Sequence, residues 1–167
     1  MKKFFVLFVV LLFSLKSFSQ EKPQFDSTLP DKIKAVFDWT FENPSDSVMA
    51  TNFISNFIKA YDEFNPMGEY KLAVVSHGAE VLIFAKKNYE KHKEVIDRLK
   101  SMTQSYGLKI YVCRNTMRFF GLKEEDMQPF IIIVPAGVVE LAKLQEEGYR
   151  LIPAVVHDLN KVKESYK

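Results

Sequence analysis

The sequence predicts an α/β fold in which helices cover both faces of a parallel β-sheet. Short apolar runs, typical of buried strands, alternate along the chain with longer segments in which apolar residues recur every three or four positions. Strands and helices that alternate at this spacing are typical of βαβ units. Hydrophobic residues make up 47% of the chain, which is sufficient for one well-packed core.

Five strands are expected, each bounded by a turn or by a helix signal. Tyr70–Ser76 and Phe130–Val134 are short and nearly continuously apolar, which is the pattern of strands buried on both faces of a sheet. The other three expected strands are Lys32–Trp39, Leu108–Cys113 and a last strand that begins at Arg150–Pro153.

Helices are expected between these strands. Ser45 follows an Asn-Pro break and is a suitable N-cap for the first helix, whose apolar residues form one wide face. Gly107, Gly121 and Gly148 each follow an expected helix, at the position where glycine commonly ends one. The expected helices are 45–64, a short one ending at Phe84, Tyr89–Tyr106, Asn115–Gly121, Val138–Glu147 and a terminal one in Asp158–Lys167.

The first 19 residues have the three-part plan of a secretory signal peptide. Two lysines precede the apolar run Phe4–Phe13, and the small residues Ser17 and Ser19 stand at the positions that signal peptidase reads. The run is about half the roughly 20 residues that a membrane-spanning helix needs. We therefore expect cleavage and export to the periplasm or another extracytoplasmic location, with no stable membrane span afterwards; an uncleaved anchor is the alternative.

Removal of residues 1–19 changes the sign of the net charge. The segment holds three lysines and no acid, so Lys plus Arg falls from 23 to 20 against 21 Asp plus Glu, and the formal net charge falls from +2 to −1. A near-neutral chain without a dense basic stripe is unsuited to bind nucleic acid. The single cysteine excludes an internal disulfide, so stability is expected from packing and oligomerisation.

The mature chain is expected to hold one domain. Residues 20–31 are polar, contain two prolines and are expected to form a flexible lead. Residues 32–156 form the α/β domain, and residues 157–167 form a polar tail or a short helix.

Candidate functional residues follow the carboxyl ends of four expected strands. In a parallel sheet these ends share one edge, and ligands bind there. Cys113 directly precedes an expected helix, whose free N–H groups stabilise a thiolate, and Arg114 adds positive charge. The alternative is that Cys113 is a small buried residue that closes its strand. Candidate binding residues at this edge are Asp38, His77, Gly78, Arg114, Asn115, Thr116, Pro135 and Gly137.

These binding candidates also have structural interpretations. His77 can act as a base or bond an anion, but it can also cap a turn. Gly78 and Gly137 allow a ligand to approach the backbone, or serve only as turn residues, and Asn115 and Thr116 are good N-cap residues. The chain has no zinc-site spacing, no serine nucleophile elbow and no phosphate-binding fingerprint. No metal and no cofactor is therefore expected.

Four segments of the chain resemble the DsrE/DsrF-like family, and the resemblance extends from about residue 32 to residue 153. It implies a three-layer α/β/α fold with a five-stranded, mainly parallel sheet, usually assembled into homo-oligomers, either trimers or hexamers. In sulfur-relay members a cysteine at the end of the third strand carries sulfur as a persulfide between partner proteins, and Cys113 matches that position. The four segments are Val74–Gly78, Tyr111–Met117, Val134–Leu141 and Leu144–Tyr149 leading to Pro153.

Two main functional hypotheses follow. In the first, the protein is an exported persulfide carrier or other thiol-active, sulfurtransferase-like protein that uses Cys113 with a sulfur donor or acceptor protein. In the second, it is a non-catalytic small-ligand-binding or oligomeric interaction module, with the ligand held around His77, Gly78 and Gly137. A weaker third hypothesis is a cysteine hydrolase that pairs Cys113 with His77.

Overall fold

The computed structural model describes residues 22–157 and 159–166, and its centre is a five-stranded sheet. The strand order is β4-β3-β2-β1-β5, and each neighbouring pair is parallel. This confirms the predicted parallel sheet. The strands are β1 (Lys32–Trp39), β2 (Glu69–Ser76), β3 (Lys109–Cys113), β4 (Ile132–Val134) and β5 (Arg150–Pro153).

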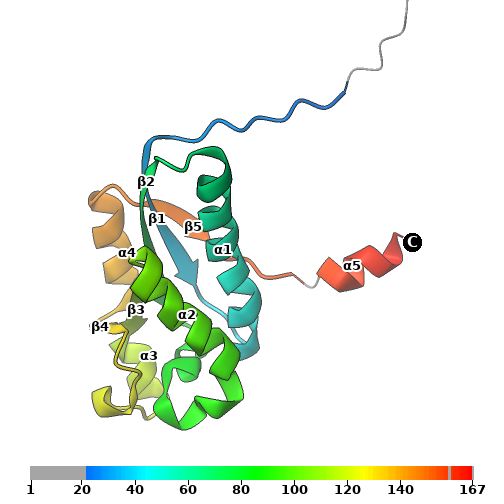
Figure 1. Ribbon diagram of the computed structural model, residues 1–167. Helices are drawn as coiled ribbons and strands as arrows, with labels where there is room; N and C mark the ends of the chain where they lie inside the picture. Colours follow the sequence, from blue (N-terminus) through cyan, green and yellow to red (C-terminus); the bar gives the residue numbers. More distant parts are fainter. Residues whose placement is uncertain (1–21, 158, 167) are drawn as a thin grey trace, which may run out of the picture.

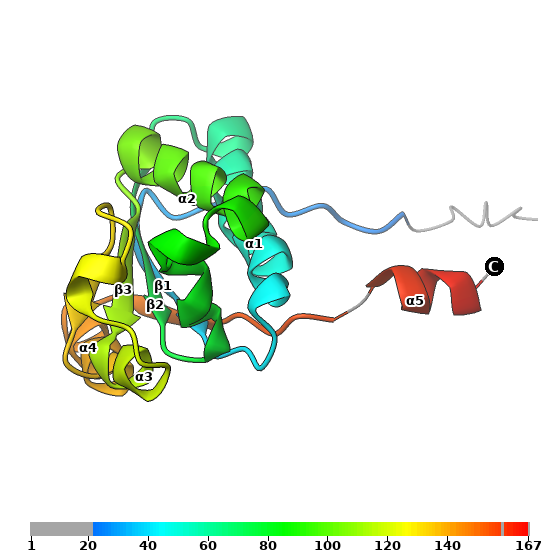
Figure 2. The same ribbon diagram turned by 90° about the horizontal axis from the view of Figure 1, so that it is seen from below.

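Helices cover both faces of the sheet and make the three-layer α/β/α arrangement that the family resemblance implied (Figure 1). Two helices, α1 (Ser47–Phe64) and α2 (Lys93–Tyr106), lie on one face, and α4 (Gly137–Glu146) lies on the other (Figure 2). The short helix α3 (Arg114–Phe119) follows β3 at the carboxyl edge. Five 3-10 turns complete the domain: η1 (Pro44–Asp46), η2 (Ala79–Phe84), η3 (Lys86–Asn88), η4 (Glu90–His92) and η5 (Glu124–Asp126).

The alternation of side chains along the strands divides the core in two. In β1, Phe37 and Trp39 point toward α1 and α2 and belong to the larger cluster, whereas Val36 points toward α4. The smaller cluster on the α4 side also contains Val75 and Leu144. A single ten-residue helix is only about 15 Å long, so α4 covers only part of its face of the sheet.

Three predicted elements differ from the structure. Asn43, not Ser45, is the first cap: its side chain accepts the Ser45 N–H at 3.0 Å and begins η1, so α1 starts two residues later than expected. The helix expected from Tyr89 begins with 3-10 turns, and α2 proper starts at Lys93. The strand expected to be buried on both faces, β4, lies at one of the two edges of the sheet, and Ile132 is 42% exposed.

Both ends of the described chain lie outside the three layers (Figures 1 and 2). Residues 22–31 are mostly exposed and are tied to α1 by a hydrogen bond from the Tyr61 hydroxyl to the Pro30 carbonyl at 3.0 Å. The terminal helix α5 (Leu159–Ser165) stands clear of the sheet. The expected signal peptide, residues 1–19, lies outside the described residues. Within residues 22–157 and 159–166, no helix is long and apolar enough to cross a membrane.

Candidate functional site

The parallel sheet brings four of the predicted residues together at its carboxyl edge. Asp38 lies near the end of β1, His77 follows β2, Cys113 ends β3 and Gly137 begins α4 after β4. They are linked by contacts between neighbouring loops, and each contact involves His77 or Cys113. The rule that residues past parallel strands meet at one edge therefore holds in this protein.

His77 is held by a carboxylate and a hydroxyl. Its Nε2 lies 2.8 Å from Asp38 Oδ1 and 2.9 Å from Thr40 Oγ1. The hydrogen bond to Asp38 is the main cause that raises the pKa of His77; burial acts in the opposite direction, and the charges of Asp38, Glu80 and Cys113 add to the increase. The imidazolium form of His77 is therefore more stable here than in a free histidine.

Cys113 is buried, with 5% of its surface exposed, but hydrogen-bond donors surround its sulfur. Burial is the largest single influence and raises the pKa of the thiol. The Thr116 hydroxyl and the backbone N–H groups of Thr116, Gly137 and Asn115 together outweigh it, so the pKa of Cys113 is lowered. The start of α3 thus supplies hydrogen-bond donors to the sulfur, and Cys113 is also buried, as the alternative interpretation required.

The turn at Gly137 packs directly against His77. A Cβ atom added to Gly137 would lie 2.6 Å from His77 Cβ and 2.9 Å from His77 Cγ, which no ordinary contact allows. On the other side, the Thr116 hydroxyl donates to the His77 carbonyl oxygen at 2.9 Å. His77 is therefore fixed between α3 and α4, beside the thiol.

A buried carboxylate that sequence reasoning missed holds the neighbouring loops. Glu80 is fully buried and accepts hydrogen bonds from the Ser76 hydroxyl at 2.8 Å, the Gly78 N–H at 2.9 Å and the Phe41 N–H at 2.8 Å. It thereby ties the loop after β1 to the loop after β2. The sequence does contain a sign of this role, because Glu80 is the only charged residue in the otherwise apolar segment AEVLIF.

The comparisons with known proteins identify the family and support the fold. The sequence matches the model of the DsrE/DsrF-like family over residues 34–154. The chain belongs to the DsrE/DsrF-like family. No curated protein matches its sequence.

Two solved structures resemble this DsrE/DsrF-like chain. A protein of unknown function from Methanobacterium thermoautotrophicum has 20% sequence identity and a TM-score of 0.56, and the match covers 72% of this chain and 98% of that one. A conserved protein of unknown function from Bacteroides thetaiotaomicron has 19% identity and a TM-score of 0.48, with 72% and 93% covered. The first likeness supports the three-layer fold alone.

Other predicted site residues of the DsrE-like domain have different environments. Arg114 Nε lies 3.3 Å from Glu124 Oε1. The carboxylate of Glu124 therefore partly offsets the positive charge of Arg114, which was expected to stabilise the thiolate of Cys113. Asn115 and Pro135 are exposed. Gly78 allows two backbone segments to pack closely, because an added Cβ would lie 2.5 Å from the Phe41 nitrogen.

This arrangement suits a nucleophilic sulfur. A thiolate held by fixed donors is the reactive form of cysteine, and a neighbouring imidazolium can stabilise negative charge or supply a proton. Among the residues that the structure describes, no group of three or more His, Cys, Asp or Glu side chains is placed to hold a metal ion.

Proposed function

We propose that this DsrE/DsrF-like protein is an exported sulfur carrier that holds sulfur as a persulfide on Cys113. The observation that supports this function is the set of donors around the sulfur, from Asn115, Thr116 and Gly137, which lowers the pKa of the thiol although it is buried. Donors at fixed positions favour the thiolate over the thiol, and the thiolate is the attacking species in sulfur transfer. The family has a sulfur-relay-like fold, which agrees with this role.

The transfer step needs no external oxidant. The Cys113 thiolate attacks the outer sulfur of a donor persulfide, a new S–S bond forms, and the S–S bond of the donor breaks to release the donor thiolate. The electron pair of the broken bond leaves with that thiolate, and the proton of the outer sulfur stays on the new Cys113 persulfide. An acceptor thiolate then attacks the same outer sulfur and releases Cys113 as a thiolate.

The small exposed area of Cys113 restricts which donors can react. With 5% of the residue exposed, a bulky donor has less access to the sulfur than a small inorganic polysulfide. We expect inorganic polysulfide to load Cys113 faster than a protein-bound persulfide that is not the physiological partner. Loading only after the addition of urea would mean that the folded protein does not accept sulfur.

Intact mass of the protein purified without reductant tests the proposal. The expected result is a mass excess of one sulfur after incubation with polysulfide, which dithiothreitol removes and which Cys113→Ser lacks. Iodoacetamide should label native Cys113 faster at neutral pH than a model thiol. No added sulfur and no labelling below the unfolding transition would overturn the carrier role.

Burial of Cys113 favours the second candidate function, a non-catalytic ligand-binding module of the same fold. In that case the edge around His77, Gly78 and Gly137 holds a small ligand, and Cys113 only closes the strand. Cys113→Ala would then leave ligand affinity within a factor of about two, whereas a carrier loses its sulfur entirely.

Export and oligomerisation are parts of the same proposal. Export predicts that mature protein from the extracytoplasmic fraction begins at Gln20, and the N-terminal sequence of that protein is the test. Assembly into a trimer or hexamer is supported by apolar side chains on the surface of α4: Val138 is 63% exposed and Val139 64%. Light scattering of the mature protein should give a mass of three or six chains, and a monomer at high concentration would exclude it.

A further inference from the structure

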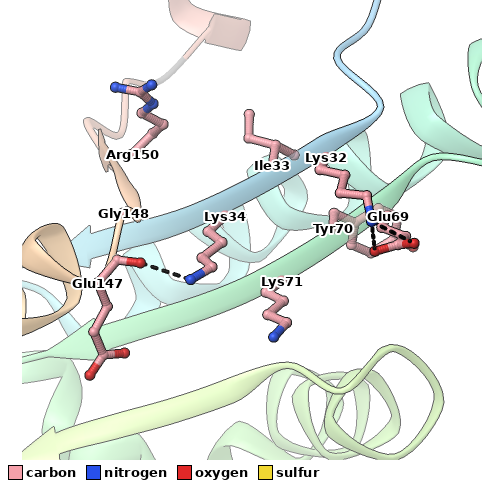
Figure 3. A pocket seen from close by; sticks show the side chains of 9 residues that line it. All are labelled: Lys32, Ile33, Lys34, Glu69, Tyr70, Lys71, Glu147, Gly148 and Arg150. Atoms are coloured by element: carbon pink, nitrogen blue, oxygen red, sulfur yellow. Dashed lines mark hydrogen bonds and ion pairs between the residues drawn. The ribbon is translucent and has the colours of Figure 1, made fainter.

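A second site is indicated at the opposite end of the sheet from Cys113. A cavity of about 660 Å³ lies at the amino ends of β1 and β2, beside the turn from α4 to β5, and its walls include Lys34, Tyr70, Lys71 and Glu147 (Figure 3). Its volume is within the range of small-molecule sites in proteins. The cavity shares no lining residue with the Cys113 edge.

The strand register explains why cations gather there. On the α4 side of the sheet, Val36 and Val75 lie under α4 in the smaller core. Two residues before Val36, at the amino end that α4 leaves uncovered, the same alternation places Lys34 on this side, and Lys34 is the register partner of Lys71. Figure 3 shows both lysines projecting to the same side of the two strands. Lys109 is the partner of Ala73 on β3, so it also lies on this side.

This pair of lysines is electrostatically unfavourable without a counter-charge. Lys32 and Glu69, the register pair two residues earlier, carry opposite charges and form an ion pair at 3.1 Å. Lys34 faces Lys71 instead, and like charges directly opposite one another on neighbouring strands are destabilising. Lys34 donates to the carbonyl oxygen of Glu147 at 2.8 Å, and its Nζ lies 5.6 Å from the centre of the Tyr149 ring; neither group carries a negative charge. Within residues 22–157 and 159–166, Lys71 has no hydrogen-bond or ion-pair partner.

The geometry points to a binding site for a small phosphate- or sulfate-type oxyanion between Lys34 and Lys71. Neighbouring strands lie about 4.8 Å apart, a separation that one tetrahedral oxyanion can bridge with two of its oxygens. Each ammonium has three N–H donors, so Lys34 can keep its bond to Glu147 and still bind the anion. The bound charge removes the repulsion between the two lysines.

The surroundings favour a small anion over a long polyanion. Glu69 and Glu147 also line the cavity and would repel a chain of negative charges that extends past Lys34 and Lys71. Arg150 also lines the cavity, but its side chain points away from Lys34 and Lys71 (Figure 3). The anion is either free in solution or the end group of a small organic molecule.

Titration calorimetry of the whole mature protein tests the site with three probes: inorganic phosphate, inorganic sulfate and phenyl phosphate. We expect Lys71→Gln to weaken phosphate binding about tenfold, because a charge-assisted contact is lost. The control Lys59→Gln removes an exposed lysine on α1, at the other face of the sheet, and should leave affinity unchanged. Tighter binding of phenyl phosphate than of phosphate identifies an end group, and equal affinities identify a free oxyanion.

A thermal measurement separates ligand binding from a structural role of Lys71. Without ligand, Lys71→Gln should leave the Tm unchanged or raise it, since the like-charge pair is relieved. With phosphate at 100 times the wild-type Kd, the wild type should gain about 5–10 °C, and a variant that binds tenfold more weakly should gain about half as much. Cys113→Ser should bind phosphate with the affinity of the wild type. The anion-site proposal and the sulfur-carrier proposal can therefore be tested separately. No binding, equal losses in Lys59→Gln and Lys71→Gln, or preferential binding of heparin would each overturn the proposal.

Discussion

The Nε2 atom of His77 lies 2.8 Å from Oδ1 of Asp38, and this contact joins the ends of β2 and β1 beside the thiol of Cys113. The pair is partly buried: the side chains of His77 and Asp38 are 16% and 27% exposed. It places an imidazole whose pKa is raised next to a cysteine whose pKa is lowered. Opposite charges on neighbouring groups stabilise each other, so the imidazolium form of His77 and the thiolate form of Cys113 favour one another.

Asp38→Asn should make the stability of the protein less dependent on pH. The pKa of His77 is raised in the folded state, so its stabilisation is complete below about pH 6.5 and is lost as pH rises through the raised value. The difference in free energy of unfolding between wild type and variant should therefore be largest near about pH 5.5 and shrink toward alkaline pH. Urea denaturation over a series of pH values measures it.

NMR titration of the imidazoles supplies the control for Asp38→Asn. The pKa of His92 is lowered, mainly by burial and then by the charge of Lys91, so His92 shifts in the direction opposite to His77. Asp38→Asn should lower the pKa of His77 and leave that of His92 unchanged. Equal shifts at both histidines would mean that the substitution disturbs the whole domain and not the pair.

Thr116→Val should make Cys113 less reactive at neutral pH. The Thr116 hydroxyl has one proton, which it gives to the His77 carbonyl, and it can turn that proton toward a Cys113 thiolate. Without it the pKa of Cys113 rises, and we expect the iodoacetamide rate at pH 7 to fall by about a factor of five. The pH dependence of the alkylation rate measures the change.

Thr103→Val is the matched control. Thr103 also donates its hydroxyl to a backbone carbonyl, that of Lys100 at 2.7 Å, but it lies on α2 away from the thiol. It should cost similar stability, about 1 kcal/mol or less, and leave the alkylation profile unchanged. A similar loss of alkylation rate in both variants would mean that the Thr116 hydroxyl does not stabilise the Cys113 thiolate.

Gly137→Ala should disturb both His77 and Cys113. The new Cβ would lie 2.6 Å from His77 Cβ, so the start of α4 must move away from His77, and the Gly137 N–H moves with it from the sulfur. We expect a loss of about 1–3 kcal/mol in stability and a raised pKa of Cys113. Gly121→Ala provides the contrast: its φ of 67° makes alanine costly by about 1 kcal/mol, but no atom lies within 4 Å of the added Cβ. It should leave the thiol unchanged.

The sequence was sufficient for the elements of the fold but not for their order in the sheet. Apolar periodicity located all five strands, because burial depends on the local alternation of side chains. The order depends on the crossover through α4, which carries β5 back beside β1 and leaves β4 at the edge. The segment FIIIV therefore looked fully buried, although Ile132 is 42% exposed.

The position of a residue at the end of a strand predicted the site better than the charge of its side chain did. The strand-end rule brought Asp38, His77 and Cys113 together, because parallel strands must end at the same edge. The ion pair of Arg114 with Glu124 could not be foreseen, since it depends on the path of the loop between α3 and β4. Donors to the thiolate also include the backbone of Gly137, which comes from a different strand connection.

Glu80→Gln should destabilise the carboxyl edge more than any surface substitution of the same kind. The buried carboxylate accepts from Phe41 N–H, Gly78 N–H and the Ser76 hydroxyl, and a glutamine amide would turn an NH₂ group toward at least one of these donors. We expect a loss of about 2–4 kcal/mol in the free energy of unfolding, measured by urea denaturation. The exposed Glu63→Gln should stay within about 0.5 kcal/mol of wild type. Phe41 N–H and Gly78 N–H donate to different oxygens of Glu80, and a glutamine amide keeps only one acceptor oxygen, so hydrogen exchange at one of these two amides should accelerate in Glu80→Gln and at neither in Glu63→Gln. Unchanged exchange at both amides would mean that Glu80 does not hold the two loops together.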